Sequence, residues 1–192
     1  MRKKIIGVLL AAGHSTRFGE SKQSFLLPNG REMALQSALN LQQAVDEVVV
    51  VLRSEHAALQ ARLQAHGCTC LMLAQEQAPM GYSIATAVQA TVRPDVGGWL
   101  IALADMPYIA TTSLSQMAMT LAQPNTLICA PTYQGQRGHP VGFHASLASA
   151  LTQLATEEGA KTVLAQHRDH ITLIEVDDAN VVYDVDEKSQ LQ

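Results

Sequence analysis

The stretch KIIGVLLAAGHSTRFGESKQ, residues 4–23, passes from a continuous apolar run into a polar loop that contains two glycines, an arginine and a lysine. The apolar run is typical of a strand that is buried on both faces of a parallel sheet. Small side chains and main-chain amides after such a strand let an anion approach closely. Arg17 and Lys22 add two positive charges, so the loop is suited to a triphosphate, although a solvated turn with scattered charges has the same composition.

The spacing within this loop excludes two common phosphate-binding motifs. The dinucleotide-binding fingerprint G-x-G-x-x-G needs more glycines than Gly13 and Gly19. The P-loop needs a lysine directly after its last glycine, whereas Lys22 comes three residues after Gly19. The pattern that remains over residues 11–23 is A-A-G-x-S-x-R-x-G-x-x-K-Q.

The composition restricts the class of protein. The 192 residues are 47% hydrophobic and 16% charged, which is typical of a globular protein, and we expect one domain over residues 1–192. The net charge of −4 lacks the basic surplus of a nucleic-acid binder. The short first apolar run leads straight into a polar loop, so we expect a cytoplasmic protein without an export signal or a membrane span. Three cysteines without a CxxC pair fit a reducing compartment.

Apolar runs and helical patterns alternate along the chain, which predicts an α/β fold. The expected architecture is a Rossmann-like three-layer sandwich with a mostly parallel central sheet and helices on both faces. Expected strands cover residues 4–11, 47–52, 68–74, 98–105, 126–131, 171–176 and 180–185; expected helices cover residues 32–45, 54–67, 81–92, 111–123, 144–154 and 159–167. The second helix is expected to be capped by Ser54 and to end at Gly67. The glycine-rich segment 130–143 is expected to be an irregular, substrate-binding loop.

Three aspartates are candidate metal ligands. Ligands of such sheets bind at the carboxyl ends of the strands, where Asp105 lies, and its carboxylate suits Mg²⁺ unless it only caps the turn before Pro107. Asp184 and Asp186 alternate in an extended stretch and therefore share one side, either as ligands or as an exposed acidic tail. The acidic pair 177–178 is expected to be a solvated turn.

Two other polar residues have two interpretations each. His139, beside Arg137, contacts a phosphate group or has a structural role. Ser83 contacts a ligand or is the N-cap of the helix that follows Gly81. The remaining histidines have no zinc-binding spacing, so we expect no zinc site.

Five motifs resemble one enzyme family in the same order. The loop LLAAGHSTRFGESKQ resembles the LAAGxSxRMGxxK signature of nucleotidyltransferases that build NDP-sugars and related pyrophosphate-linked products. The other four matching segments are MGYSIATAV (80–88), ALADMP (102–107), YQGQRGHPVGF (133–143) and VYDVDEKSQ (182–190). The segments 133–143 and 182–190 together resemble a narrower branch, the molybdenum cofactor cytidylyltransferases of the MobA-like, GT-A type nucleotidyltransferases. Phe18 replaces the usual methionine, and the closing motif lacks its Thr-Pro.

The resemblance implies transfer of CMP from CTP to the terminal phosphate of molybdopterin, with release of pyrophosphate. It implies catalytic roles for Lys22 and Arg17, a metal site for Mg²⁺ or alternatively Mn²⁺, and contacts of Arg137 and His139 with the pterin substrate. The metal ligands would be Asp105, Asp184 and Asp186, and the nucleotide-binding residues would be Leu10, Ala11, Ala12, Gly13, Ser15, Gly81 and Ser83. In similar sequences an alanine at position 12 accompanies the use of cytosine.

Other activities within this resemblance stay open. They are a cytidylyltransferase for a sugar or polyol phosphate of the methylerythritol phosphate type, a guanylyltransferase of the same cofactor, and a non-catalytic nucleotide-binding cofactor chaperone. The expected partners are CTP and molybdopterin, together with the molybdoenzyme that accepts the cofactor or its chaperone. We expect no nucleic acid and no membrane among the partners.

Overall fold

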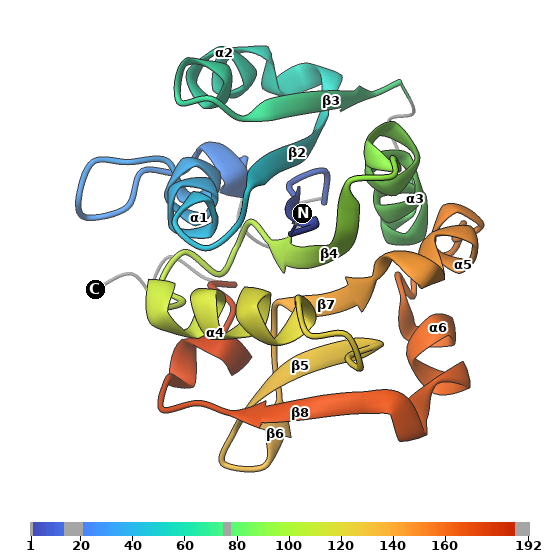
Figure 1. Ribbon diagram of the computed structural model, residues 1–192. Helices are drawn as coiled ribbons and strands as arrows, with labels where there is room; N and C mark the ends of the chain where they lie inside the picture. Colours follow the sequence, from blue (N-terminus) through green and yellow to red (C-terminus); the bar gives the residue numbers. More distant parts are fainter. Residues whose placement is uncertain (1, 14–20, 75–77, 187–192) are drawn as a thin grey trace.

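The computed structural model describes residues 2–13, 21–74 and 78–186 as a sheet between two layers of helices (Figure 1). The strands are β1 (Lys4–Leu10), β2 (Glu47–Arg53), β3 (Thr69–Leu73), β4 (Val96–Leu103), β5 (Ile128–Tyr133), β6 (Gln136–Arg137), β7 (Val141–His144) and β8 (Ile171–Glu175). The helices are α1 (Met33–Gln42), α2 (Ala57–Ala65), α3 (Met80–Thr91), α4 (Thr111–Leu121), α5 (Ala148–Thr152) and α6 (Lys161–Gln166).

The sheet has the order β3-β2-β1-β4-β7-β5-β6, and β8 pairs with β5. The pairs β1–β2, β1–β4, β2–β3 and β5–β8 are parallel, whereas β7 and β6 are antiparallel to their neighbours. The predicted α/β architecture with a mostly parallel sheet is therefore confirmed.

The central strand β1 explains why both faces of the sheet are covered. Ile5 and Leu9 belong to one buried cluster together with residues of α1, α2 and α4. Ile6 and Val8 alternate with them and belong to a second cluster together with residues of α3, α5 and α6. Figure 1 shows α1 and α4 on one side of the sheet and α3, α5 and α6 on the other. Burial on both faces is the reason for the uninterrupted apolar run.

Two segments differ from the expectation. The segment 130–143 contains the end of β5, all of β6 and the start of β7, so it is a hairpin within the sheet and not an irregular loop. The expected strand 180–185 is wrong, because residues 179–182 form the 3-10 helix η5 (Ala179–Val182). The carbonyl of Val181 accepts a hydrogen bond of 2.7 Å from the amide of His139, so this main chain pairs with the hairpin segment instead of with a strand.

The helix expected at 54–67 begins only at Ala57, after a 3-10 turn, η2 (Ser54–His56), and Ser54 is not its N-cap. Its end is as expected, because Gly67 has a φ of +84°, a conformation that glycine adopts without steric cost. The helix expected at 144–154 is shorter, with a 3-10 turn over residues 145–147 before α5.

Asp178 is buried, which corrects the expectation of a solvated turn. Its Oδ2 accepts hydrogen bonds from the Ala110 amide (2.8 Å) and the Ser113 hydroxyl (2.9 Å) at the start of α4. Its Oδ1 accepts from the amide (3.1 Å) and side chain (2.9 Å) of Asn180. This carboxylate therefore joins η5 to α4, and η5 leads into the segment that carries Asp184.

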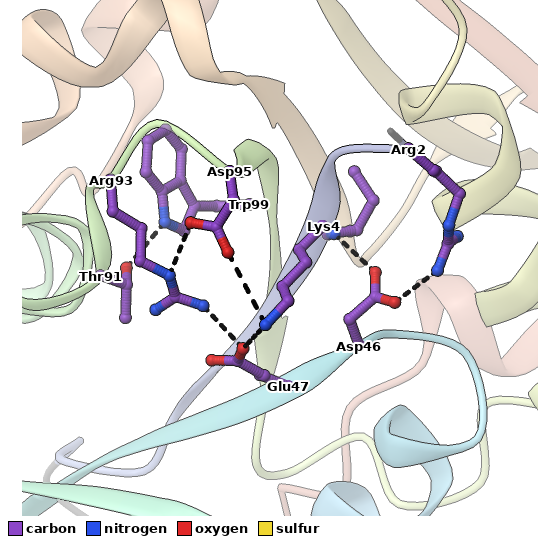
Figure 2. Close-up of polar contacts among 9 residues, drawn as sticks. Arg2, Lys4, Asp46, Glu47, Thr91, Arg93, Asp95 and Trp99 are labelled. Carbon is purple, nitrogen blue, oxygen red and sulfur yellow. Dashed lines mark hydrogen bonds and ion pairs between the residues drawn. The ribbon is translucent and has the colours of Figure 1, made fainter.

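A polar network joins the amino ends of β1, β2 and β4 (Figure 2). Glu47 accepts hydrogen bonds from Lys4 (2.8 Å) and Arg93 (2.6 Å), which lower the pKa of its carboxyl. Arg93 also contacts Asp95 at 2.9 Å. The network lies at the edge opposite the carboxyl ends of these strands, so its charges are remote from a ligand bound there.

Two of the three cysteine side chains are buried. Burial raises the pKa of Cys68 to about 11 and that of Cys129 to about 12, so both are protonated at neutral pH and pack as small apolar groups. In residues 2–13, 21–74 and 78–186, no helix has the length and apolar character needed to cross a bilayer.

We expect Asp178→Ala to lower the free energy of unfolding by about 2–3 kcal/mol, because it leaves buried donors unpaired. Chemical denaturation of both proteins measures this difference. The control is Asp177→Ala, an exposed neighbour that should change stability by less than about 0.5 kcal/mol. Equal effects of the two substitutions would contradict the structural role of Asp178.

Candidate functional site

A cavity of about 480 Å³ lies at the carboxyl ends of β1 and β4. It is lined by Leu10, Ala12, Gly13, Lys22, Gln23, Met33, Ala78, Met80, Ser83, Leu103, Ala104, Asp105 and Glu157. The lining comes from α1 and the 3-10 turn η1 (Lys22–Ser24) on one side, and from α3 with the loop before α6 on the other. Ligands of parallel α/β sheets bind at this edge, so the cavity is the candidate site.

The turn after β4 is held by side chains of α1. The Ser37 hydroxyl donates to the carbonyl of Ala104 at 2.9 Å, and the Asn40 side chain donates to the carbonyl of Pro107 at 2.8 Å. Asp105 lies between these two anchors. Its position at the edge of the cavity is therefore fixed from the helix layer as well as from the sheet.

The closing segment is joined to this turn by its main chain. The Val185 amide donates a hydrogen bond of 2.9 Å to the carbonyl of Asp105. The Val185 side chain is fully buried and packs with Leu27 and Met33. Since alternate residues of an extended segment point to opposite sides, burial of Val185 directs Asp184 and Asp186 outward together.

Carboxylate oxygens of Asp105, Asp184 and Asp186 lie within 4.8 Å of one another. The Oδ1 of Asp105 is buried and has no hydrogen-bond partner in the part of the chain that the structure describes. An unpaired buried oxygen is costly unless a ligand satisfies it, and hard oxygen ligands are those that Mg²⁺ and Mn²⁺ prefer. The residues present therefore fit a divalent cation.

Lys22 contacts two of these carboxylates. Its Nζ donates to Asp105 Oδ2 at 2.8 Å and to Asp186 Oδ1 at 2.9 Å, and its side chain is only 11% exposed. Burial alone would lower the pKa of Lys22, but the hydrogen bonds to Asp105 and Asp186 outweigh burial and raise it. The ammonium therefore stays charged at neutral pH.

Only some of the expected nucleotide-binding residues line the cavity. Of these residues, Leu10, Ala12, Gly13 and Ser83 line the cavity. Ala11 belongs to the buried cluster on the α1 side of the sheet. Ser15 lies outside the described residues, as does the expected catalytic residue Arg17. Ser83 is not an N-cap, because α3 begins at Met80 and Pro79 precedes it.

Gly81 was expected to contact the nucleotide, but the structure shows that it packs against another loop of the chain. Its amide donates to the carbonyl of Thr156 at 2.8 Å, and a Cβ at this position would lie 2.8 Å from the same oxygen. Only glycine permits this approach of α3 to the loop before α6.

The two expected pterin contacts lie outside the residues that line the cavity. Arg137 is exposed on β6. His139 has a buried Nδ1 without a hydrogen-bond partner among the described residues. Burial lowers the pKa of His139, and the charges of Asp105 and Asp184 oppose that shift.

Several lining residues were not predicted. Gln23 donates from its side chain to the carbonyl of Gly13 at 2.8 Å, which joins the two ends of the polar loop. Its position next to Lys22 was the signal that could have identified it. Met80 begins the matching segment 80–88, although it was not singled out within it. Glu157 gave no signal, because only the packing of its loop against α3 brings it to the cavity.

Comparisons with known proteins identify related sequences and structures. A family model described as "MobA-like NTP transferase domain" matches residues 7–171. Purine catabolism protein PucB of Bacillus subtilis (strain 168) is 27% identical over 172 residues, 83% of this chain and 80% of that protein. Nicotine blue oxidoreductase of Paenarthrobacter nicotinovorans is 27% identical over 197 residues, 97% of this chain and 94% of that protein.

A solved structure is similar over nearly the whole length. Rv0371c from Mycobacterium tuberculosis H37Rv has a TM-score of 0.81 at 26% identity, over 98% of this chain and 95% of that chain. A second structure of Rv0371c, in complex with manganese, has a TM-score of 0.76 at 24% identity over 94% of each chain.

The contacts of Lys22 imply that its ammonium competes with a divalent cation for the same carboxylates. We expect Lys22→Met, without nucleotide, to bind Mn²⁺ about tenfold more tightly than the wild type, since a unit charge at about 4 Å contributes on the order of 1 kcal/mol or more. Titration of free Mn²⁺ by electron paramagnetic resonance measures this affinity. Lys3→Met, at the amino edge of the sheet, is the matched control. Unchanged or weaker binding to Lys22→Met would rule out the competition.

Proposed function

The chain belongs to the MobA-like NTP transferase family of nucleotidyltransferases, and on that premise we propose that it transfers CMP from CTP to molybdopterin. The observation that carries the proposal is the cluster of Lys22 and three carboxylates beside a cavity at the carboxyl edge of the sheet. The names of the two curated relatives describe different activities, so the choice of substrates rests on this chain's own residues. We propose that residues 1–192 act as one nucleotidyltransferase domain.

The proposed reaction joins two phosphate groups. An oxygen of the terminal phosphate of molybdopterin attacks the α-phosphorus of CTP, the bond from that phosphorus to the bridging oxygen breaks, and pyrophosphate leaves. The attacking oxygen is already ionised at neutral pH, so the reaction needs no general base. The barrier comes from bringing anions together, and catalysis is therefore positioning and positive charge.

Lys22 is the residue proposed to place that charge at the α-phosphate. It lies in the wall of the cavity, and its raised pKa keeps the ammonium protonated. The proposal assigns Arg17 to the β- and γ-phosphates and the amide of Gly13 to the remaining oxygens.

The proposed metal ligands are Asp105, Asp184 and Asp186. A Mg²⁺ or Mn²⁺ ion bound there supplies a Lewis acid that neutralises charge on the phosphates. The manganese complex of Rv0371c supports a divalent cation in this fold. The acidic residues themselves hold and orient the cation, and the Val185 amide keeps the two chain segments together.

Two features favour CTP and the pterin acceptor. Ala12 lines the cavity, and the proposal is that a side chain at this position leaves less space for a purine than a glycine would. The Arg137–His139 segment resembles that of the molybdenum cofactor branch, which favours a pterin acceptor. The Lys22-Gln23 pair also resembles the methylerythritol phosphate branch. However, the Gln23 side chain donates a hydrogen bond to the Gly13 carbonyl, so a structural role can explain the glutamine without that substrate.

The proposal is tested by pyrophosphate release from CTP with Mg²⁺ and molybdopterin. Methylerythritol phosphate as acceptor and GTP as donor are the comparison reactions. A cofactor chaperone releases no pyrophosphate in any of them. Turnover that prefers GTP or methylerythritol phosphate would replace the proposal with the corresponding alternative.

We expect Lys22→Ala to lower kcat for pyrophosphate release by roughly 10²–10³, the usual loss for one well-placed charge donor at a developing anion. The fold should persist, because the main-chain contacts of η1 remain. Steady-state kinetics of the variant and of Lys3→Ala, the exposed control, check this. Near-normal kcat in Lys22→Ala would remove Lys22 from the catalytic residues.

A further inference from the structure

Glu157 is the acidic residue of the cavity that the proposed reaction does not use. It lies in the loop between α5 and α6 and lines the cavity together with Met80 and Ser83 of α3. Its carboxylate makes no hydrogen bond or ion pair with any residue in the described ranges. An acceptor group is therefore free to contact a ligand at this wall.

The loop that carries Glu157 is held against the start of α3 at two points. The Gly81 amide bonds to the Thr156 carbonyl at 2.8 Å, next to Glu157 in the chain. Two residues later, Gly159 has a φ of +59°, and a Cβ there would lie 2.9 Å from the sulfur of Met80. These close approaches fix the main chain on both sides of Glu157, and its exposed side chain lines the cavity.

The charges around the cavity determine which part of a nucleotide contacts this wall. Lys22 lies on the side of η1 and α1, where it suits phosphate groups. Glu157 lies on the α3 side, where its neighbours Ala78 and Met80 are uncharged. A carboxylate repels phosphates, whereas small apolar groups suit a planar heterocycle. The α3 side is therefore the side for the base.

We propose that Glu157 selects the base by accepting a hydrogen bond from the exocyclic amino group of cytosine. This inference rests on the proposed use of a pyrimidine nucleoside triphosphate. A carboxylate accepts hydrogen bonds but donates none, so it pairs with the 4-amino group of cytosine. Uracil has a carbonyl oxygen at the same position, and two acceptors repel each other. Glu157 is thus a specificity-determining residue that discriminates CTP from UTP.

The test compares Glu157→Gln with the wild type. The amide of glutamine can both donate and accept, so it tolerates the uracil carbonyl. We expect the preference for CTP over UTP to fall by about 10- to 100-fold, the usual effect of an unpaired polar group in a specificity site. The ratio of the two dissociation constants is measured by calorimetry with Mg²⁺, and the ratio of kcat/KM by pyrophosphate release. Glu158→Gln is the matched control, because Glu158 is adjacent and equally exposed but is not among the residues that line the cavity.

The outcomes separate this inference from the proposed function. An unchanged CTP/UTP ratio in Glu157→Gln, or an equal change in Glu158→Gln, overturns the inference while pyrophosphate release still supports the function. Loss of folding stability in Glu157→Gln without a change of ratio also overturns it and assigns the residue a structural role beside α3. A shifted binding ratio in a protein that releases no pyrophosphate supports the inference and refutes the catalytic proposal. A wild-type preference for GTP overturns both.

Discussion

Like charges at close range are the constraint on which the candidate site depends. Three carboxylates within 4.8 Å of one another repel, and they stay together only if positive charge lies among them. Lys22 supplies that charge through bonds to Asp105 and Asp186, residues 83 and 164 positions away from it. The same interaction joins η1, the turn after β4 and the closing segment, so the proposed catalytic charge also links three distant parts of the chain.

The apolar pattern of the sequence was sufficient to predict the sheet and its two helix layers, because a central strand that is buried on both faces has apolar residues at nearly every position. The alternation of Ile5 and Ile6 between two clusters illustrates this. Asp105 and Lys22 were also predictable. Asp105 ends the apolar run 98–105, and Lys22 lies in the glycine-containing polar loop after the first apolar run. Residues that depend on distant packing were not. Glu157 lies at the cavity only because Gly81 admits the main chain of Thr156.

Predictions from local composition were wrong where a contact with a distant part of the chain determines the structure. The acidic pair 177–178 has the composition of a solvated turn, yet Asp178 is buried because the start of α4 offers it donors. The segment 134–142, which contains β6 and the start of β7, is rich in glycine and polar residues, so it lacks the apolar alternation of a strand. It joins the sheet through main-chain bonds to β4 and β5, which no side-chain pattern records.

The long sequence separation within the acidic cluster has a consequence for biosynthesis. A ribosome adds about 5–20 residues per second, so the codon for Asp186 is read several seconds after that for Asp105. A nascent chain therefore contains Lys22 and Asp105 before it has the closing carboxylates. The full cluster of carboxylates around Lys22 therefore forms only after translation has passed Asp186.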